Sequence, residues 1–353
     1  MKRKLVLENG QEFIGYSFGK VNDVIAEVVF NTSIVSYHEV LSDPIYSNQM
    51  VCMTYPLIGT YGLADEDYDP KNTFVKAYII KEYNDIPSNF RSTRTLVDAM
   101  EENNIVGLCG VDTREITKTI RDNGTMFGYI CSEEKSVEEA LKEIENYKNN
   151  RLSEKVTCKK VWYARTYNPL YQVVAIDLGC KTSDIKALNG VGVNVTVVPS
   201  TSSYEDIMKF KPNGILLTNG PSSPSDNKEI VELVKKFIGK LPILGLSLGM
   251  NIIGLSYGAT SYKMKFGHHG SNATIKNLNT DKLQIVSENR LYGLDLSSLE
   301  NTNLKITHLN VLDNTVEGII DEENKVLGFG FEPQTVVDND EYIFRQFINL
   351  MSK

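Results

Sequence analysis

Residues 241–250 read Leu-Pro-Ile-Leu-Gly-Leu-Ser-Leu-Gly-Met, and this stretch decides the fold. An apolar run of strand length ends at Gly245-Leu246-Ser247-Leu248-Gly249, and a helical pattern follows it. This is the pattern of a nucleophile elbow, in which two glycines let a strand and a helix approach each other around one strained residue. The side chain of Ser247 is then expected to point into a crevice, and the next backbone N–H can face an oxyanion.

The sequence around this elbow alternates between apolar runs and amphipathic helical stretches. Largely apolar runs of this length are typical of strands that are buried on both faces of a parallel sheet. The expected strands span 173–178, 193–199, 214–218 and 241–246, and the expected helices span 183–190, 204–210 and 227–238. Such alternation predicts a doubly wound α/β domain with its ligand crevice at the carboxyl ends of the strands. Any site is therefore expected after Gly179, Asn219 or Leu246.

The chain before about residue 140 has a different pattern, of short strands separated by turn signals. Lys4–Leu7 and Glu12–Gly15 flank a turn that contains Asn9-Gly10, which predicts a hairpin because both turn residues tolerate positive φ. Helical patterns follow at 95–103 and 113–122. This half is therefore predicted to be mixed α and β.

The length of 353 residues is sufficient for two domains of ordinary size. Between about 149 and 169 the periodicity fades into a polar, lysine-rich stretch, which is typical of an inter-domain connection. We therefore predict one domain at 1–150 and a second at 170–353.

Composition and charge exclude several classes of function. The net charge is -8 and the basic residues are interspersed with acids, so no nucleic acid partner is expected. The apolar run after Met1 is too short for the hydrophobic region of a signal peptide, which favours the cytoplasm. The five cysteines show no C-x-x-C spacing, so they are expected to be free thiols.

Two further features favour ordinary structural roles. Leu241–Ala259 is uncharged and long enough to resemble a membrane span, but several glycines, Pro242 and Asn251 interrupt it. It is expected to form a buried strand and a buried helix, with no membrane partner. His268 and His269 are adjacent and would point to different sides of a strand, and no third ligand is apparent at a usable spacing, so no metal site is predicted.

The elbow and the segments that follow it resemble class I, or triad-type, glutamine amidotransferases. In that family the elbow reads G-x-C-L-G-H-Q, and the family's later L-G-A and K-F-G-H segments are matched by Gly258-Ala259 and Lys265-Phe266-Gly267-His268. The resemblance implies a C-terminal class I glutamine amidotransferase domain with the doubly wound α/β fold.

The first half is similar to the N-terminal domain of the small subunit of carbamoyl-phosphate synthetase. The segments that match that family, in its order, are Phe30-Asn31-Thr32-Ser33, Asp43-Pro44, Thr54-Tyr55-Pro56, Ser88-Asn89-Phe90-Arg91 and Asp112-Thr113-Arg114, and Asn219-Gly220-Pro221 and Thr307-His308-Leu309-Asn310 continue the match. The resemblance implies a large synthetase subunit as partner, with ATP and Mg expected on that subunit and no cofactor on this chain. It also implies pyrimidine or arginine biosynthesis, without distinguishing them.

The resemblance places three altered residues at the family's catalytic triad. Ser247 stands at the cysteine, Glu332 at the histidine and Gln334 at the glutamate. An imidazole can deprotonate a thiol whose pKa is near about 8.5, whereas a carboxylate cannot generate an alkoxide. The sequence therefore predicts that glutamine hydrolysis is lost.

The resemblance also places eight residues at the positions that hold glutamine. Gly220, Leu248 and Asn289 are retained, whereas Ser222, Asn251 and Leu291 replace the family's glycine, glutamine and glycine. Ile45 replaces a serine, and Tyr292 ends the segment that begins at Asn289. A side chain at residue 222 would block the substrate or alter the backbone near the oxyanion hole.

Three hypotheses follow for the function. The first is a binding subunit that does not hydrolyse glutamine and pairs with a large subunit that uses free ammonia. The second is a small subunit that hydrolyses glutamine despite the substitutions. The third is a free-standing serine hydrolase that uses Ser247. His269 is its remaining candidate base, because His268 and His308 lie in segments that do not supply a base in the family.

Overall fold

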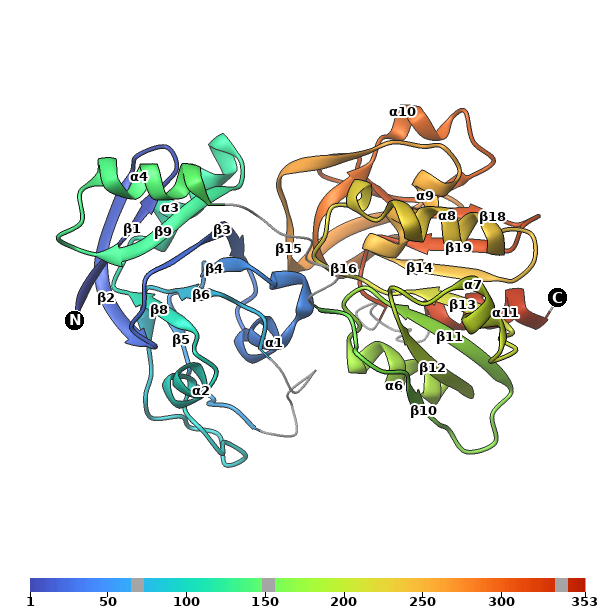
Figure 1. Cartoon of the computed structure of the whole chain (residues 1–353), viewed down its shortest axis with the longest axis horizontal. Coiled ribbons are helices and arrows are strands. Elements are labelled where there is room, and N and C mark those ends of the chain that lie inside the picture. The colour runs from blue at the N-terminus through green and yellow to red at the C-terminus, as the bar shows by residue number, and fades with distance from the viewer. Residues whose placement is uncertain (65–72, 148–155, 334–341, 353) are drawn as a thin grey trace. The chain divides into compact units, whose positions relative to one another are not determined.

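The computed structural model of the chain describes residues 1–64, 73–147, 156–333 and 342–352. The chain divides into two units, Met1–Asn150 and Arg151–Lys353 (Figure 1). Residues 149–155 of the predicted connection lie outside the described part. All five cysteines are free thiols, as expected.

Seven strands of the first unit close into a barrel in the order β1-β2-β8-β6-β4-β3-β9. Their bounds are β1 (Lys2–Leu7), β2 (Glu12–Gly19), β3 (Val24–Asn31), β4 (Gln49–Met53), β6 (Ala77–Ile79), β8 (Val106–Cys109) and β9 (Met126–Ser132), and β5 (Leu57–Ile58) pairs with β7 (Glu82–Tyr83) in a separate sheet. The predicted hairpin is confirmed, because β1 and β2 pair antiparallel and Gly10 has a φ of 85° in their turn.

Helices cover this barrel, and two of them begin within one residue of the predicted positions. The helices are α1 (Tyr37–Ser42), the 3-10 helix η1 (Pro44–Tyr46), α2 (Leu96–Glu102), α3 (Thr113–Asn123) and α4 (Val137–Asn146). The N-terminus of α2 is closed by a capping box between Thr95 and Asp98, and Asp112 caps α3. Mixed α and β structure in this half is therefore confirmed.

A ten-stranded sheet forms the centre of the second unit, in the order β10-β12-β11-β13-β14-β19-β18-β17-β15-β16. Its strands are β10 (Trp162–Ala164), β11 (Tyr171–Asp177), β12 (Val193–Pro199), β13 (Gly214–Leu217), β14 (Ile243–Leu246), β15 (Ser261–Asn277), β16 (Leu283–Leu294), β17 (Lys305–Asn310), β18 (Val316–Asp321) and β19 (Val326–Phe329). The strands from β12 to β19 in this order are parallel, as predicted, and the remaining pairings are antiparallel.

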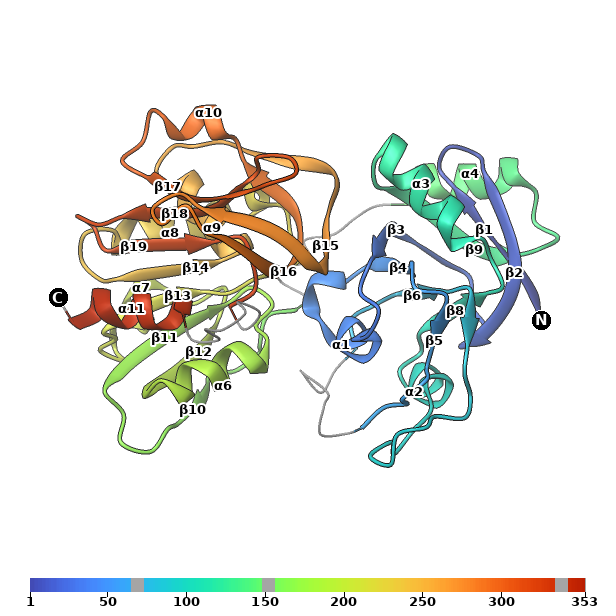
Figure 2. The same cartoon turned by 180° about the vertical axis from the view of Figure 1, so that it is seen from behind.

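Helices pack on both faces of this sheet, which is the doubly wound arrangement (Figures 1 and 2). Apolar side chains of α7, α8 and α9 enter one core, and those of α6 and α11 enter the other. The bounds are α6 (Thr182–Gly190), α7 (Tyr204–Met208), the 3-10 helix η3 (Pro224–Asp226), α8 (Lys228–Phe237), α9 (Leu248–Ser256), α10 (Leu296–Leu299) and α11 (Tyr342–Ser352). Among the described residues, no helix combines the length and apolar character needed to span a membrane.

Candidate functional site at the elbow

The predicted strand, turn and helix are present around Ser247. Strand β14 ends at Leu246, Ser247 has φ 50° and ψ -99°, and α9 begins at Leu248. A Cβ atom on Gly245 would lie 2.6 Å from the Gly249 backbone, and one on Gly249 would lie 2.4 Å from the Leu217 carbonyl oxygen. The two glycines are therefore required by close packing of the strand and the helix.

The Ser247 hydroxyl is buried at this turn without a hydrogen-bond partner in the described part of the chain. The residue is 5% exposed, and its backbone N–H donates to the carbonyl oxygen of Phe329 over 2.7 Å. A positive φ at a serine costs on the order of 1–3 kcal/mol, so the surrounding packing must hold this conformation. No described histidine or carboxylate is hydrogen-bonded to the hydroxyl that the serine hydrolase hypothesis needs as nucleophile.

We expect Ser247→Gly to raise the free energy of unfolding by about 1 kcal/mol. Glycine relieves the positive φ and removes a buried hydroxyl that has no partner, and these gains exceed the entropy that glycine adds to the unfolded chain. Urea denaturation measures the change. Ser247→Ala is the matched variant, because it removes the hydroxyl and keeps the backbone strain. Its free energy of unfolding should therefore be lower than that of Ser247→Gly. The reverse order would contradict the strained turn.

Glu332 lies beyond the end of β19 and is held by a lysine. Its carboxylate forms an ion pair with Lys181 Nζ over 2.5 Å, and its backbone N–H donates to the carbonyl oxygen of Ser287. Lys181 immediately precedes α6, after the carboxyl end of β11, where the sequence predicted that a site would lie. The lysine itself was not predicted, because its partner is 151 positions away in the chain.

Two backbone N–H groups at the elbow share one acceptor. The Asn219 Oδ1 atom accepts from Gly220 N over 2.8 Å and from Leu248 N over 3.3 Å. A Cβ atom on Gly220 would lie 2.1 Å from the Leu178 carbonyl oxygen, so this glycine is also required by close packing. The Ser222 side chain is buried and accepts a hydrogen bond from Asn227 Nδ2 over 2.8 Å.

Further predicted site residues come from α9 and β16. Asn251 is buried, and its Nδ2 donates to the Tyr292 carbonyl oxygen over 3.2 Å, while its Oδ1 has no hydrogen-bond partner in the described residues. Asn289 accepts from Asn219 Nδ2 through its carbonyl oxygen, and its side chain contacts His269 Nδ1 at 2.6 Å. Leu291 is buried on the same strand. The structure therefore links Ser247, Leu248, Asn251, Asn289 and Tyr292 through α9, β16 and Asn219.

Two predicted residues are not placed with this group. Ile45 belongs to the first unit, where it is buried in η1 and its N–H donates to Asp43 Oδ1. Gln334 lies outside the described residues. Their assignments to the glutamine site and to the triad stay predictions.

A cavity of about 420 Å³ lies elsewhere in the second unit, after the carboxyl end of β12. It is lined by Ser200–Glu205 and by residues of η3 and α8. None of the predicted site residues lines this cavity, so the cavity is not part of the predicted site.

Comparison with known proteins identifies the family. Residues 5–130 match the model of the carbamoyl-phosphate synthase small chain, CPSase domain, and residues 174–350 match the model of class I glutamine amidotransferases. The carbamoyl phosphate synthase small chain of Staphylococcus saprophyticus is 37% identical over 100% of this chain and 96% of its own length. The chain belongs to the carbamoyl-phosphate synthase small chain family.

Other members of the small chain family match to a similar extent. The pyrimidine-specific small chain of Bacillus subtilis is 38% identical and covers 99% of this chain and 96% of its own length. The small chain of Aquifex aeolicus is 38% identical, with 98% of each chain covered. The fold and family predicted from sequence are thereby confirmed, together with a glutamine amidotransferase domain in a family whose small chains imply a large-subunit partner.

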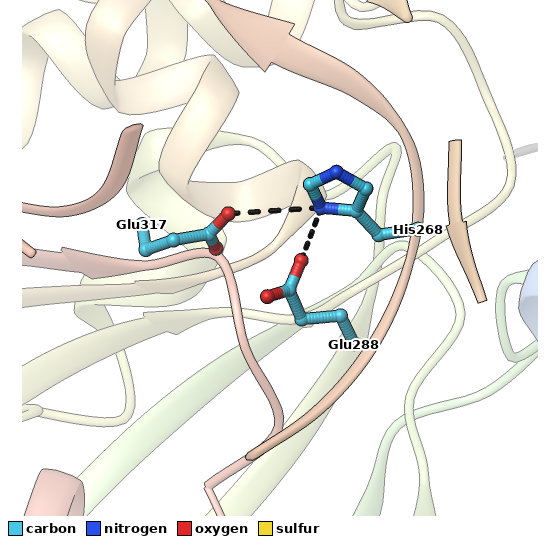
Figure 3. Close-up of side chains that lie close together, drawn as sticks. All are labelled: His268, Glu288 and Glu317. Atoms are coloured by element: carbon cyan, nitrogen blue, oxygen red, sulfur yellow. Dashed lines mark hydrogen bonds and ion pairs between the residues drawn. The ribbon is translucent and has the colours of Figure 1, made fainter. Parts of the chain in front are cut away.

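A cluster of charged side chains lies on the antiparallel strands of the second unit (Figure 3). His268 on β15, Glu288 on β16 and Glu317 on β18 present ligand atoms within 4.8 Å of one another. The sequence offers no third ligand at a usable spacing from His268 and His269, and the two carboxylates beside His268 come from β16 and β18, which are not its sequence neighbours. Spacing along the chain gave no signal of this cluster.

The cluster is better explained as an ion-pair network than as a metal site. Arg290 donates to Glu317, and His268 contacts Glu288 through Nδ1 and Asp313 through Nε2, the latter over 2.8 Å. Burial disfavours the charged imidazole, but the hydrogen bonds to Asp313 and Glu288 outweigh it and raise the pKa of His268 to about 9. A protonated imidazole has no lone pair for a metal, and Arg290 already supplies positive charge.

We expect this network to make stability depend on pH above neutrality. Because the pKa of His268 is raised from 6.5 to about 9, its contribution is fully present below pH 6.5 and is lost as the pH rises through 9. The free energy of unfolding should therefore fall by about 2–3 kcal/mol more in the unmodified chain than in His268→Gln between pH 6.5 and pH 9. Urea denaturation at both pH values measures this difference.

The unmodified chain must be compared with His268→Gln because other buried groups also make stability depend on pH. Burial raises the pKa of Glu317, against the opposing effect of Arg290, and it raises the pKa of Cys52 to about 12, so both groups also lower stability as the pH rises. Cys52 contributes equally to the two proteins. Equal pH dependence of the two proteins would contradict the assignment of a protonated His268 to this network.

Proposed function

We propose that this chain is a carbamoyl-phosphate synthase small subunit that does not hydrolyse glutamine. It pairs in the cytoplasm with a large subunit that binds ATP and Mg and makes carbamoyl phosphate from bicarbonate and free ammonia, for pyrimidine or arginine synthesis. The small subunit acts in this complex as a structural or regulatory partner.

One observation carries this proposal: the Ser247 hydroxyl has no hydrogen-bond partner in the described chain, while Glu332 is held by Lys181. A serine nucleophile needs a base within hydrogen-bond reach, at about 2.6–3.2 Å. Glu332 stands at the proposed position of the catalytic histidine, and its charge is balanced by the lysine. The Ser247 hydroxyl therefore has no hydrogen-bonded base that could take its proton.

The chemistry of the two residues leads to the same conclusion. Glutamate has an ordinary pKa of about 4.3, far too low to remove a proton from a serine hydroxyl at neutral pH. Histidine returns the proton to the leaving ammonia in the triad mechanism, a step that an ionised carboxylate cannot perform. Ser247 and Glu332 therefore support neither half of the reaction.

The proposed glutamine positions support the same function. Asn251 is shorter than the glutamine for which it stands, and its amide is directed to the backbone of Tyr292. Ser222 and Leu291 add side chains where the family has glycine, and both side chains are buried. These changes lower the affinity for glutamine independently of the loss of the nucleophile.

Ammonia release from glutamine by the co-purified complex of this chain and its large subunit tests the proposal. We expect release at the background rate of glutamine alone, together with stable co-purification of a large, ATP-binding partner. Saturable ammonia release would favour a hydrolytic small subunit. Hydrolysis of a simple ester by the chain without any partner would favour the free-standing serine hydrolase.

A further inference from the structure

The cavity of about 420 Å³ in the second unit opens between the segments that precede α7 and α8. Residues 200–203 follow the carboxyl end of β12, and η3 and Asn227 follow β13. Because α7 and α8 pack into the same hydrophobic core, the cavity lies on one face of the sheet. It lies at the end of the strands where doubly wound folds bind ligands, and its volume is within the range of small-molecule sites.

Apolar side chains form the inner part of this cavity. Ile230 and Leu233 of α8 line it and are 5% and 8% exposed. The Tyr204 ring also lines the cavity and packs on Phe237, with 5.0 Å between the ring centroids. The cavity can therefore bury the hydrocarbon part of a ligand.

The polar groups of the lining carry negative charge. Among its described residues are one lysine, Lys236, and four carboxylates, which belong to Glu205, Asp226, Glu229 and Glu232. Glu232 pairs with Lys235 over 2.7 Å at the surface, whereas the carboxylates of Glu205 and Asp226 form no ion pair or hydrogen bond with another described residue. A ligand of this cavity is therefore expected to carry positive charge and to donate hydrogen bonds.

A buried amide gives a second, independent indication of a ligand. Asn227 lines the cavity and is 3% exposed, and its Nδ2 donates to Ser222 Oγ and to the Ser223 carbonyl oxygen, over 2.8 Å each. Because a carbonyl can only accept, these contacts fix the orientation of the amide. The Asn227 Oδ1 atom does not cap α8 and accepts no hydrogen bond from another described residue. A buried amide oxygen without a donor is costly, and a donor on a ligand would satisfy it.

We propose that this cavity binds a small organic cation of the diamine or polyamine class. Its ammonium groups donate to Asn227 Oδ1 and pair with Glu205 and Asp226, while its methylene chain covers Ile230 and Leu233. A bare metal ion would leave the apolar inner part uncovered, and an anion would be repelled by the carboxylates. The site is independent of glutamine hydrolysis and goes beyond the proposed function.

Calorimetric titration of the full chain at constant ionic strength tests this inference. Spermidine, with about ten non-hydrogen atoms, is expected to bind with a Kd on the order of 0.1–1 mM. The matched pair of smaller probes is 1,4-diaminobutane, which should bind, and 1,4-butanediol, which has the same chain without charge and should not. Equal binding of these two compounds would overturn the inference. Tighter binding of a tri-lysine peptide than of spermidine would also overturn it, in favour of a protein partner.

Amide NMR signals show whether the ligand occupies this cavity. Spermidine should shift the side-chain ¹H–¹⁵N signals of Asn227 with the Kd found by calorimetry, because the oxygen of the same amide gains a donor. Mg²⁺ at the same ionic strength should leave these signals unchanged. Spermidine shifts that leave Asn227 unaffected, or a saturable shift of Asn227 by Mg²⁺ alone, would overturn the inference.

The double variant Glu205→Gln, Asp226→Asn should raise the Kd of spermidine at least about tenfold. Both side chains are exposed, so the fold should tolerate the changes. The matched control is Glu322→Gln, Glu323→Gln, which removes the same charge from exposed residues before β19, at the amino end of the parallel strands. The control should keep the Kd of the unmodified chain. Equal Kd values for the two double variants would overturn the inference.

Discussion

Ser247→Cys alone is expected to leave ammonia release from glutamine at the background rate. The thiol would sit at the same strained turn, where no described group is hydrogen-bonded to the present hydroxyl. A thiolate attacks readily once an imidazole has taken its proton, but Glu332 is a carboxylate that forms an ion pair with Lys181. The cysteine at residue 247 therefore lacks a base that would take its proton. It also lacks an acid that would return the proton to the leaving ammonia.

We expect a large gain in glutamine hydrolysis from one combined variant. It carries Ser247→Cys, Glu332→His, Gln334→Glu and Ser222→Gly. Loss of a nucleophile or its base can each cost about a million-fold in turnover, and such losses are not additive, so restoration must be simultaneous. We expect at least about a 1,000-fold rise in kcat over the single variant. KM should stay high, because Asn251 and Leu291 remain at two of the predicted glutamine positions.

Steady-state ammonia release by the complex with the large subunit measures both variants. The matched control is the combined variant with Ser247 retained, which should remain at background because it lacks the thiol. Recovery of activity by Ser247→Cys alone would show that Glu332 does not limit the site, and the account of the altered triad would then be wrong.

Gly249→Ala is expected to destabilise the second unit by about 3 kcal/mol or more. The new Cβ atom would lie 2.4 Å from the Leu217 carbonyl oxygen and 2.7 Å from the Leu217 Cβ atom. Both atoms belong to β13, in the middle of the sheet, so the clash cannot be relieved by rotation of a flexible side chain. Helix α9 must therefore move away from the sheet, which also displaces the Leu248 donor.

Gly190→Ala is the matched control for this substitution. Gly190 is the last residue of α6, and a Cβ atom there would meet nothing within 4 Å. Alanine at that position should be neutral or stabilise by up to about 1 kcal/mol. Urea denaturation compares the two variants, and equal effects of the two substitutions would contradict the packing assigned to the elbow.

The sequence predicted the elements around the elbow because their signals are local. The apolar run before Gly245 and the helical pattern after Ser247 specify a strand, a turn and a helix without reference to the rest of the chain. The same holds for the hairpin around Gly10 and for Thr95 and Asp112, which cap helices that lie within one residue of the prediction.

Long-range partners could not be predicted in the same way. The first unit closes into a barrel through pairings of β6 with β4 and β8, which no turn signal specifies. Lys181 and Glu332 approach each other only because β11 and the segment after β19 end at the same side of the sheet. His268, Glu288 and Glu317 come from three different strands, so their proximity depends on the register of the antiparallel part.

The most direct test of the central claim is carbamoyl phosphate synthesis by the complex of this chain with its large subunit, with one nitrogen donor at a time. With ammonium as the only donor we predict full synthesis, and with glutamine as the only donor we predict a rate at least about 1,000-fold lower. Comparable rates with glutamine and ammonium would contradict the account, because they would require a working nucleophile at Ser247.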